Sequence, residues 1–493
     1  MKLDKILKSI SYKKRNEFLK EYDIEISSIT NDSREVDAKT IFVAIEGFKK
    51  DGHDYIKDAI SRGAKVILCE KEEFLKENAS VFIIENPRKL LSKLSNLIYR
   101  EPSKKLNLVG VTGTNGKTSI TYILDYIFKD NNYKTGIIGT MGAVIDGGKY
   151  VLNNTTPESN QLHSLMKEMV DKKIKNCFIE VSSHSTKLNR VDDISFNIGI
   201  FTNLTKDHLD FHKTMEDYYQ AKKAFFYKVD KAIVNIDDKY GFRLYKELKK
   251  DNIDVVSYSL NKKSDYKADI KDTSINGTYF DMVTKNKSYE FKINTPGKFS
   301  VYNTLACIIA ADLSGIKIDK IKKSLESFKG VVGRFELINT ELDCTIILDF
   351  AHTPDGLEKI METIDQVAKG RKIVMFGAGG ERDISRRSLM GEVAGRYCHM
   401  CYLTSDNPRH EEPKSICEEI AEGVKKYHNN YKIIVDRKEA INYIIDNYQK
   451  NDIILLAGKS TEPYQAIEDK KIPYDERDIT MKAIIKKEIN MKG

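Results

Sequence analysis

The stretch from Leu106 to Phe128 constrains the fold of this chain more than any other. An apolar run, Leu106–Val111, has the length and β-branched content of a buried parallel strand. A glycine-containing turn at residues 113–116 follows, and Lys117 then opens a segment with helical spacing at Ile120–Phe128. In such a strand–turn–helix unit, backbone N–H groups and the positive helix end surround phosphate oxygens. The order of elements therefore predicts an α/β unit that binds a nucleotide.

The side chains of this loop suit a nucleoside triphosphate. Lys117 would neutralise the outer phosphates, and the Thr118 hydroxyl would ligate Mg²⁺. The common pattern has glycine where Val111 stands, so an ordinary strand-to-helix turn that carries a lysine is the alternative. Both flanking elements favour nucleotide binding. The candidate nucleotide contacts, which the resemblance described below assigns to ATP, are Gly113, Thr114, Asn115, Gly116, Lys117, Thr118 and Ser119.

The length of 493 residues exceeds the size of a single core and predicts about three domains. Residues 1–101 combine short strands with a helix and predict a small α/β domain. Residues 102–332 alternate strands and helices, as in a doubly wound, P-loop-type sheet that binds a nucleotide, with an antiparallel insert at 253–293. Residues 333–493 repeat the alternation and predict a second, Rossmann-like α/β domain.

Charge and cysteine content argue against several classes of protein. The net charge of +8 is a small remainder of 81 basic and 73 acidic residues, and no dense basic block marks a nucleic-acid surface. No run approaches the roughly 18 apolar residues of a membrane span, and the N-terminus lacks the apolar core of a signal peptide. Seven scattered cysteines predict reduced thiols. We therefore expect a cytoplasmic protein without nucleic-acid or membrane partners.

Polar residues end two predicted strands of the central domain. Glu180 lies at the end of Cys177–Val181, and His208 follows Ile198–Asn203. Because open α/β sheets bind ligands at the carboxyl ends of their strands, both residues are candidate metal ligands beside the phosphate loop. A hydrogen-bonded structural histidine is the alternative for His208.

Four polar clusters lie at strand ends of the C-terminal domain, which is more than connecting loops require. They span residues 349–355, 377–383, 406–409 and 458–462. These clusters predict a second set of ligand-binding side chains, with ordinary turns and surface charges as the alternative.

Six motifs, taken in their order along the chain, resemble the Mur ligases and within them the MurE type. They are Gly113-Thr-Asn-Gly-Lys-Thr118, Glu180-Val-Ser-Ser-His184, Thr202-Asn-Leu-Thr-Lys-Asp-His208, Gly333-Arg-Phe335, Asp349-Phe-Ala-His-Thr-Pro354 and Asp406-Asn-Pro-Arg409. The resemblance covers essentially the whole chain. It implies an ATP-dependent amide ligase that adds meso-diaminopimelate to UDP-MurNAc-L-Ala-D-Glu through an acyl phosphate, in peptidoglycan precursor synthesis. Mg²⁺ would be the cofactor and ATP the co-substrate, and we expect a monomer.

The resemblance also implies roles for individual residues around the nucleotide. Lys117, Glu180, His208 and Lys222 would be catalytic. Thr118 would hold a Mg²⁺ on the nucleotide side, and Glu180 and His208 would hold a second Mg²⁺ near the acceptor carboxylate. A carbamate formed on Lys222 would add an anionic oxygen ligand, because hard cations prefer oxygen ligands. Further ATP contacts would be Asn303, Arg334, Asp349 and His352.

The same resemblance implies two substrate sites. The UDP-muramoyl dipeptide would contact Ser33, Phe48 and Lys49 of the first domain and Asn154, Thr155, Thr156, Ser182 and Arg190 of the central domain. The diamino acid would contact Arg382, Asp406, Asn407, Pro408, Arg409, Gly458 and Glu462. An arginine fork at Arg409 suits the distal carboxylate of diaminopimelate, which lysine lacks, and Glu462 suits the distal ammonium.

Several alternatives remain at this stage. L-Lysine or meso-lanthionine could replace meso-diaminopimelate, and Ser460 and Thr461 depart from the Gly-Lys-Gly-His-Glu loop of many relatives. A folylpolyglutamate-synthase-like ligase would share the phosphate loop but lack the first domain. A non-catalytic ATP-binding scaffold is disfavoured, because Lys117, Glu180, His208 and Lys222 are all present.

Overall fold

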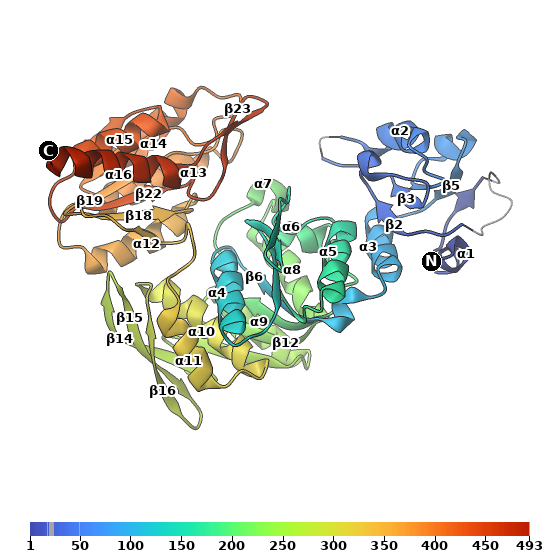
Figure 1. Ribbon diagram of the computed structural model, residues 1–493, viewed down its shortest axis with the longest axis horizontal. Helices are drawn as coiled ribbons and strands as arrows, with labels where there is room; N and C mark the ends of the chain where they lie inside the picture. The colour runs from blue at the N-terminus through green and yellow to red at the C-terminus, as the bar shows by residue number, and fades with distance from the viewer. Residues whose placement is uncertain (17, 19–23, 49, 493) are drawn as a thin grey trace.

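Three separate sheets organise the chain. The computed structural model describes residues 1–16, 18, 24–48 and 50–492. Within these residues, five strands form an N-terminal sheet, eleven a central sheet and six a C-terminal sheet, and two more strands form a hairpin. Figure 1 places the N-terminal and C-terminal sheets on opposite sides of the central one. We call the regions that hold these sheets the N-terminal, central and C-terminal parts.

The N-terminal part has a mostly parallel sheet in the order β1-β5-β4-β3-β2, with only β1 antiparallel. Its strands are β1 Lys14–Arg15, β2 Ser28–Thr30, β3 Thr40–Val43, β4 Val66–Cys69 and β5 Ser80–Ile83; its helices are α1 Leu3–Leu7, α2 Ile56–Ser61 and α3 Pro87–Ile98. Every residue of β3, β4 and β5 is buried, as continuous apolar runs in a parallel sheet require. The predicted α/β class is confirmed here.

The central sheet has the order β16-β15-β14-β13-β12-β11-β6-β10-β7-β8-β9. Its strands are β6 Asn107–Thr112, β7 Thr135–Gly139, β8 Gly142–Ile145, β9 Gly148–Tyr150, β10 Asn176–Glu180, β11 Phe196–Phe201, β12 Val229–Asn235, β13 Val255–Ser259, β14 Tyr266–Ser274, β15 Gly277–Thr284 and β16 Ser288–Ile293. The six strands from β7 to β13 in this order are parallel, and β6 lies in their middle. The phosphate loop therefore leaves the sheet near its centre.

Helices cover both faces of the central sheet. They are α4 Lys117–Asp130, α5 Ser159–Asp171, α6 Ser183–Lys187, α7 Leu209–His212, α8 Met215–Lys223, α9 Lys239–Lys250, α10 Lys298–Leu313 and α11 Ile318–Ser327. Leu108 of β6 packs into one hydrophobic core, whereas Val109 and Val111 pack into the other. The apolar run of β6 is continuous because both of its faces are buried.

The predicted antiparallel insert at 253–293 is only partly right. Val255–Ser259 is a parallel strand beside β12, reached by the crossover helix α9. Since a helical crossover returns the chain in the same direction, this strand belongs to the doubly wound sheet. The antiparallel segment is the β14–β15–β16 meander, which extends the same sheet.

The C-terminal sheet has the order β17-β18-β22-β19-β20-β21, with only β17 antiparallel. Its strands are β17 Glu336–Ile338, β18 Thr345–Asp349, β19 Lys372–Phe376, β20 Met400–Leu403, β21 Tyr431–Ile433 and β22 Ile453–Ala457. The other elements are α12 Pro354–Val367, α13 Ser385–Tyr397, α14 Pro413–Val424, α15 Arg437–Asp446, the hairpin β23 Tyr464–Ile467 and β24 Lys470–Pro473, and α16 Glu476–Lys492. A helix follows each of β18 to β21, as the sequence predicts.

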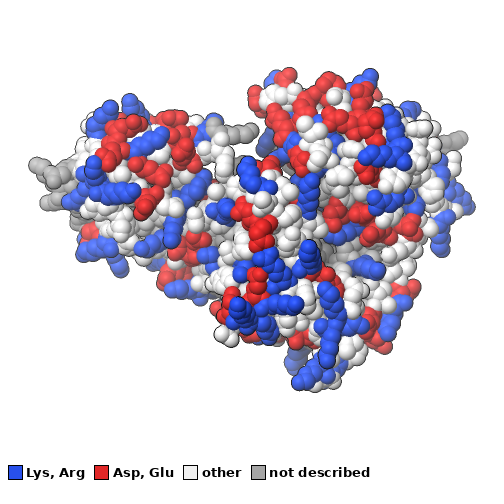
Figure 2. Space-filling view, turned by 180° about the vertical axis from the view of Figure 1, so that it is seen from behind, with Lys and Arg blue, Asp and Glu red and all other residues white. Residues whose placement is uncertain are grey.

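The surface and the thiols agree with the composition. Figure 2 shows Lys and Arg interspersed with Asp and Glu across the face it presents. All seven cysteines are free thiols. Across the described part of the chain, no helix combines the length and the apolar character that a bilayer crossing demands.

Candidate active site

Two glycines let the phosphate loop turn tightly between β6 and α4. Gly113 has φ +151° and Gly116 has φ +91°, both in the region that favours glycine. A Cβ at Gly113 would lie 1.8 Å from Oγ1 of Thr202, and one at Gly116 would lie 2.5 Å from Oδ1 of Asn303. The Thr202 hydroxyl also donates to the Asn115 carbonyl at 2.6 Å, which ties the loop to the end of β11. The loop shape therefore depends on both glycines.

Lys117 folds back over its own loop. Its Nζ donates to the carbonyl oxygens of Gly113, at 3.0 Å, and of Thr114, at 2.9 Å. Burial lowers the pKa of Lys117, while Glu180 and Asp207 act to raise it. A phosphate oxygen would be a stronger partner than these neutral carbonyls, because hydrogen bonds between ionised groups are about twice as strong.

Glu180 ends β10 beside the start of α4 and is almost fully buried. Its Oε1 accepts from the Thr118 hydroxyl at 2.9 Å and from the Thr140 backbone N–H at 3.0 Å, and its Oε2 accepts from the Thr140 hydroxyl at 3.0 Å. Arg334 of the C-terminal part donates to the Thr118 hydroxyl at 3.2 Å. A carboxylate, a hydroxyl and a guanidinium thus meet at the end of the phosphate loop.

Lys222 of α8 lies on the other side of the loop, with only 1% of its surface exposed. Its Nζ donates to the Gly113 carbonyl at 2.9 Å and to the Thr112 hydroxyl at 3.4 Å, and it lies 4.8 Å from the centre of the Tyr218 ring. Burial, and then the charge of Lys117, lower the pKa of Lys222 well below its usual value. This environment favours the neutral, nucleophilic form of the amine.

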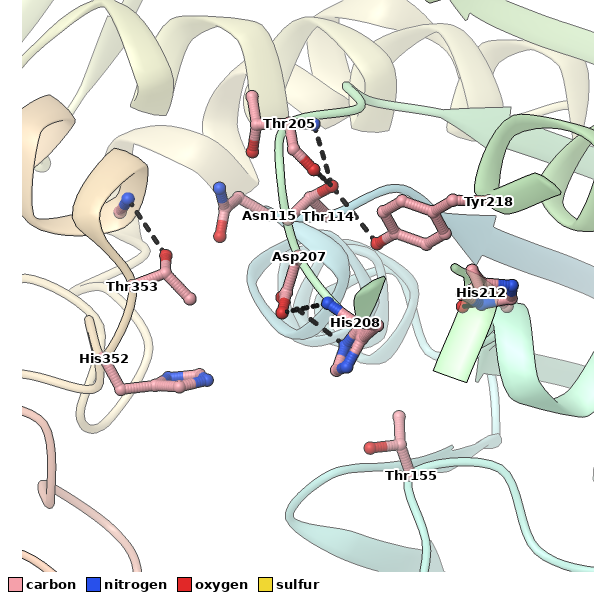
Figure 3. A network of polar contacts seen from close by, with 12 residues as sticks. Thr114, Asn115, Thr155, Thr205, Asp207, His208, His212, Tyr218, His352 and Thr353 are labelled. Atoms are coloured by element: carbon pink, nitrogen blue, oxygen red, sulfur yellow. Dashed lines mark hydrogen bonds and ion pairs between the residues drawn. The ribbon is translucent and has the colours of Figure 1, made fainter. Parts of the chain in front are cut away.

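His208 lies between the phosphate loop and Thr155 in the view of Figure 3. Its backbone N–H donates to Oδ1 of Asp207 at 2.7 Å, and its Nε2 lies 3.4 Å from Oδ2 of the same carboxylate. Burial lowers the pKa of His208 to about 3, so its ring is neutral at pH 7. Arg386 of the C-terminal part forms an ion pair with Asp207. The histidine that the sequence singles out is thus joined through Asp207 to the C-terminal part.

One cavity of about 930 Å³ joins the three parts. The predicted catalytic residues Lys117, Glu180, His208 and Lys222 all line it. So do Phe48, Thr114, Asn115, Gly116, Thr118, Ser119, Asn154, Thr155, Ser182, Arg190, Asn303, Arg334, Asp349, His352, Arg382 and Glu462. This shared lining brings together residues from all three predicted ligand sets.

Other predicted residues lie outside the lining of this cavity. They are Gly113, Ser33, Thr156, Asp406, Asn407, Pro408, Arg409 and Gly458. Ser33 is buried at the start of a short 3₁₀ turn, Ser33–Glu35. Phe48 is 76% exposed and packs edge-on against Phe211 of α7, with ring centres 5.6 Å apart. Lys49 lies outside the described residues.

A second network fixes the predicted muramoyl-peptide residues of the central part. The Thr156 hydroxyl donates to the Glu180 carbonyl at 2.7 Å and accepts from the Ser182 backbone N–H at 3.0 Å. Arg190 donates to the Thr156 carbonyl at 2.9 Å and pairs with Glu158 at 2.7 Å. Thr156 thus supports the site from behind, whereas Arg190 and Ser182 reach the cavity.

The predicted diamino-acid loop 406–409 lies along β23. The backbone N–H of Arg409 donates to the Ala466 carbonyl at 3.0 Å, and the Arg409 guanidinium donates to the Gly380 carbonyl. Asn407 donates to Oε2 of Glu462 at 2.8 Å. Hydrogen bonds along the hairpin therefore hold the loop 406–409 beside Glu462.

The loop 458–462, in which Ser460 and Thr461 depart from the Gly-Lys-Gly-His-Glu pattern, is held by hydrogen bonds to neighbouring segments. Ser460 has φ +48°, and its hydroxyl donates to the Gly333 carbonyl at 3.1 Å. Gly458, with φ +105°, donates its N–H to the Asp349 carbonyl at 3.0 Å. The loop thus bridges the start of β17 and the end of β18.

Sequence reasoning missed several residues that complete the site. The Asn115 side chain donates to Oδ2 of Asp355 at 2.6 Å, and the Thr205 hydroxyl donates to the same oxygen at 3.1 Å. Asp355 lies in α12, so this contact joins the phosphate loop to the C-terminal part. Asp355 stands in a cluster that the sequence marks as polar, whereas Thr140 follows β7 in a turn without any distinguishing pattern.

The donors near the loop fit a magnesium ion that a nucleotide brings with it. Within the described residues, no three His, Cys, Asp or Glu side chains gather as a protein-only metal cage would need. Mg²⁺ commonly takes one or two protein oxygens and completes its shell with water and phosphate. The Thr118 hydroxyl and the Glu180 carboxylate, 2.9 Å apart, supply two such oxygens.

Sequence comparison gives a consistent result along the chain. The profile of the Mur ligase middle domain matches residues 111–311, that of the Mur ligase glutamate ligase domain matches 333–460, and that of the Mur ligase family catalytic domain matches 25–99. The UDP-N-acetylmuramoyl-L-alanyl-D-glutamate–2,6-diaminopimelate ligase 1 of Clostridium acetobutylicum is 43% identical over 98% of this chain and 99% of its own length.

Solved structures give the same result. A structure titled as UDP-N-acetylmuramoyl-L-alanyl-D-glutamate–2,6-diaminopimelate ligase is 26% identical, covers 99% of both chains and has a TM-score of 0.70. A folylpolyglutamate synthase from Thermotoga maritima shares the fold at 16% identity, with a TM-score of 0.58, and covers 74% of this chain and 89% of its own.

Proposed function

This chain belongs to the Mur ligase family and is an ATP-dependent ligase, and we propose that it joins meso-diaminopimelate to UDP-MurNAc-L-Ala-D-Glu. The single observation that carries the proposal is the shared cavity. Its walls hold the phosphate loop at Lys117, the dipeptide candidate Arg190 and the diamino-acid candidates Arg382 and Glu462. The names of relatives such as the 43% identical clostridial protein supply the identity of the substrates.

The proposed reaction has two steps. The D-Glu carboxylate attacks the γ-phosphorus of ATP, which forms an acyl phosphate and releases ADP. The amine of the diamino acid then attacks the acyl carbon, so an amide forms, the amine loses a proton and inorganic phosphate leaves. Both steps bring anions together, and catalysis in such reactions depends mainly on positioning and electrostatic stabilisation. Lys117 and Arg334 supply positive charge on the nucleotide side of the cavity.

A nucleotide-side Mg²⁺ would be held by Thr118 beside the Glu180 carboxylate, and Glu180 with His208 would hold a second Mg²⁺ on the acceptor side. When bound, these ions would screen the negative charges of the ATP phosphates and of the D-Glu carboxylate. Thr140, which donates two hydrogen bonds to the Glu180 carboxylate, orients that carboxylate toward the loop. Neutral His208 has the protonation state that a metal ligand needs.

Lys222 is proposed to act as a carbamate. A neutral amine adds to carbon dioxide, a C–N bond forms and one proton is lost, which leaves an anionic oxygen ligand. The burial that lowers the pKa of Lys222 favours this neutral amine. The place of Lys222 against the Gly113 carbonyl puts the group beside the phosphate loop.

The three parts would divide the substrates between them. Residues 1–101 would bind the UDP-sugar, residues 102–332 ATP, and residues 333–493 the amino acid. Ser33 and Phe48 would serve the nucleotide sugar, and the loop 406–409 with Glu462 would serve the diamino acid. This division accounts for a cavity that reaches all three sheets.

The test is an ADP-release assay with omission of each substrate in turn. We expect release only when ATP, UDP-MurNAc-L-Ala-D-Glu and a diamino acid are all present, with meso-diaminopimelate used better than L-lysine or meso-lanthionine. ATP turnover that ignores the muramoyl substrate would refute the proposal. Preference for lysine or lanthionine would keep the ligase and replace the amino acid. Gel filtration and cell fractionation test the expected monomer and its cytoplasmic location.

A further inference from the structure

Lys459 is a fully buried cation that the proposed reaction leaves without a role. It follows β22, and none of its surface is exposed. Its Nζ donates to Oδ1 of Asn407 at 2.8 Å and forms an ion pair with Oε2 of Glu462. Burying an ammonium costs several kcal/mol unless it is paired, so this arrangement needs both acceptors. The buried charge therefore serves the two residues it contacts.

Asn407 has a fixed orientation because of this cation. Its Oδ1 accepts from Lys459 and from the Ala466 backbone N–H, at 2.7 Å. With the carbonyl oxygen facing these two donors, the amide nitrogen points to Glu462 and donates to its Oε2 at 2.8 Å. Lys459 and Asn407 thus hold the same carboxylate oxygen from two directions.

Glu462 is the member of this group that reaches the cavity. It lines the cavity together with Arg382, whereas Asn407 and Lys459 lie behind it. Burial acts to raise the pKa of Glu462, but the hydrogen bond and charge of Lys459, with help from Asn407, bring the pKa below its usual value. The carboxylate therefore faces the cavity in its ionised form, anchored through one oxygen.

We infer that Lys459 is a positioning and specificity residue. It anchors Glu462 so that this carboxylate binds the second, distal ammonium of the incoming amino acid. The inference rests on the proposed ligase function and goes beyond it, because it names a residue that never meets the substrate. A carboxylate held from behind by two donors keeps its direction at little entropic cost, which is what recognition of a single ammonium requires.

The test measures how much the enzyme gains from the distal ammonium. The probes are meso-diaminopimelate and 2-aminopimelate, which has the same carbon chain and both carboxylates but lacks the second amine. The readout is the ratio of their kcat/KM values. Loss of one charged hydrogen bond changes such a ratio by about tenfold or more. We therefore expect Lys459→Met to lower the ratio by at least about tenfold, mainly through the KM of meso-diaminopimelate.

A double-mutant cycle shows whether Lys459 acts through Glu462. Glu462→Gln should lower the ratio by a similar factor, and adding Lys459→Met to it should cause no further loss. A merely structural lysine would impair both amino acids equally, leave the ratio unchanged and add its effect to that of Glu462→Gln. An unchanged ratio in Lys459→Met would overturn the inference, and so would a further loss when Lys459→Met is added to Glu462→Gln.

Two further variants guard the experiment. Lys470→Met removes an exposed lysine of β24, in the hairpin that follows Glu462, and should leave the ratio unchanged. Should Lys459→Met fail to fold, Lys459→Gln keeps a hydrogen-bond donor without the charge, and we expect it to lower the ratio too. Wild-type enzyme that uses neither amino acid would contradict the proposed function itself, whereas an active wild type with an unaffected ratio would contradict only the role of Lys459.

Discussion

The hydroxyl of Thr118 donates a 2.9 Å hydrogen bond to the carboxylate of Glu180, 62 residues further along the chain. The parallel register of β10 beside β6, in which Glu180 is opposite Val111, brings the end of one strand to the loop that follows the other. Thr140 donates to the same carboxylate, and Arg334 donates to the Thr118 hydroxyl, so both groups are held in place beside the loop. Under the proposed function, this pair of oxygens is the site that would hold the metal ion of the nucleotide.

Thr118→Val should weaken the binding of Mg²⁺ at this proposed site and lower the activity. The substitution keeps the shape of the side chain but removes the hydroxyl oxygen, and disturbing the surroundings of a metal ligand commonly costs about 10–100-fold in affinity or activity. We expect the Mg²⁺ concentration for half-maximal ADP release to rise and kcat to fall by about that factor. Thr118→Ser, which restores the oxygen, should remain close to wild type, and equal losses in both variants would argue against a metal role.

The phosphate loop and the order of strands and helices follow closely from the sequence. The run Leu106–Val111 predicts β6 because a central parallel strand is apolar on both faces. In the structure, Val109 and Val111 pack into a different core from Leu108. Glycines with positive φ mark the loop itself. Local rules suffice where each residue obeys its own backbone preference.

The sequence does not predict the contacts between the central and C-terminal parts. Nothing in the sequence pairs Asp207 with Arg386, or Asn115 with Asp355, because these contacts depend on how the central and C-terminal parts meet. The strand at Val255–Ser259 was predicted as antiparallel for a similar reason, since its partner depends on the crossover and not on its own residues. Thr140 orients Glu180 from a turn that has no recognisable pattern.

Lys222→Ala should abolish most of the turnover, with partial recovery when short carboxylates are added. The substitution leaves a buried space next to the Gly113 carbonyl, into which formate or acetate can bring an anionic oxygen. Wild-type enzyme freed of carbon dioxide should lose activity and regain it with bicarbonate. Lys223→Ala is the matched control, because the neighbouring Lys223 forms a 2.7 Å ion pair with Glu247 and not a contact with the loop. Normal rates in Lys222→Ala would exclude the carbamate.

Arg409→Lys should raise the KM for meso-diaminopimelate by about tenfold or more, with little change in the KM for ATP. Lysine keeps the charge but loses the planar fork that binds a carboxylate through two parallel hydrogen bonds. In the present arrangement the guanidinium donates to the Gly380 carbonyl, so the substrate carboxylate must bind it in competition with a neutral acceptor. Arg396→Lys, on the exposed side of α13, is the control. An unchanged KM would reject the distal-carboxylate argument.

His163 of α5 should make the protein sensitive to acid. Burial lowers its pKa to about 3, from an ordinary value of 6.5, and neither ring nitrogen has a hydrogen-bond partner. Because the unfolded chain binds the proton more readily, the cost grows as the pH falls below 6.5 and levels off near 3. At pH 5 the expected loss is about 2 kcal/mol in the free energy of unfolding.

His163→Leu should remove that loss. At pH 7.5 the variant should be at least as stable as wild type, since it exchanges two buried, unpaired nitrogens for an apolar side chain. The measurement is Tm against pH between 7.5 and 4.5 for both proteins, with His399→Leu at an exposed position as the control. Parallel curves for wild type and His163→Leu would mean that the ring is protonated without penalty.

Arg437→Met should destabilise the C-terminal part more than any surface ion-pair variant. Arg437 and Glu476 are both fully buried and share two hydrogen bonds, at 2.6 and 2.8 Å. Removing one partner leaves a buried charge alone, which costs about 3–5 kcal/mol. The surface ion pair between the exposed Arg477 and the half-buried Glu336 is worth under about 1 kcal/mol. Urea unfolding of Arg437→Met and Arg477→Met compares the two directly.

The same variant tests a link to the proposed amino-acid site. Arg437 also donates to the carbonyl of Ala457 at 2.7 Å, two residues before Lys459, so its loss should loosen the loop that presents Glu462. We expect the KM for the diamino acid to rise while the KM for ATP stays near wild type. The double variant Arg437→Met/Glu476→Met should recover stability, because a buried pair replaced by apolar side chains leaves no lone charge, but it should not recover the KM, because the contact to Ala457 is still missing. Recovery of both properties together would show that the pair acts on stability alone.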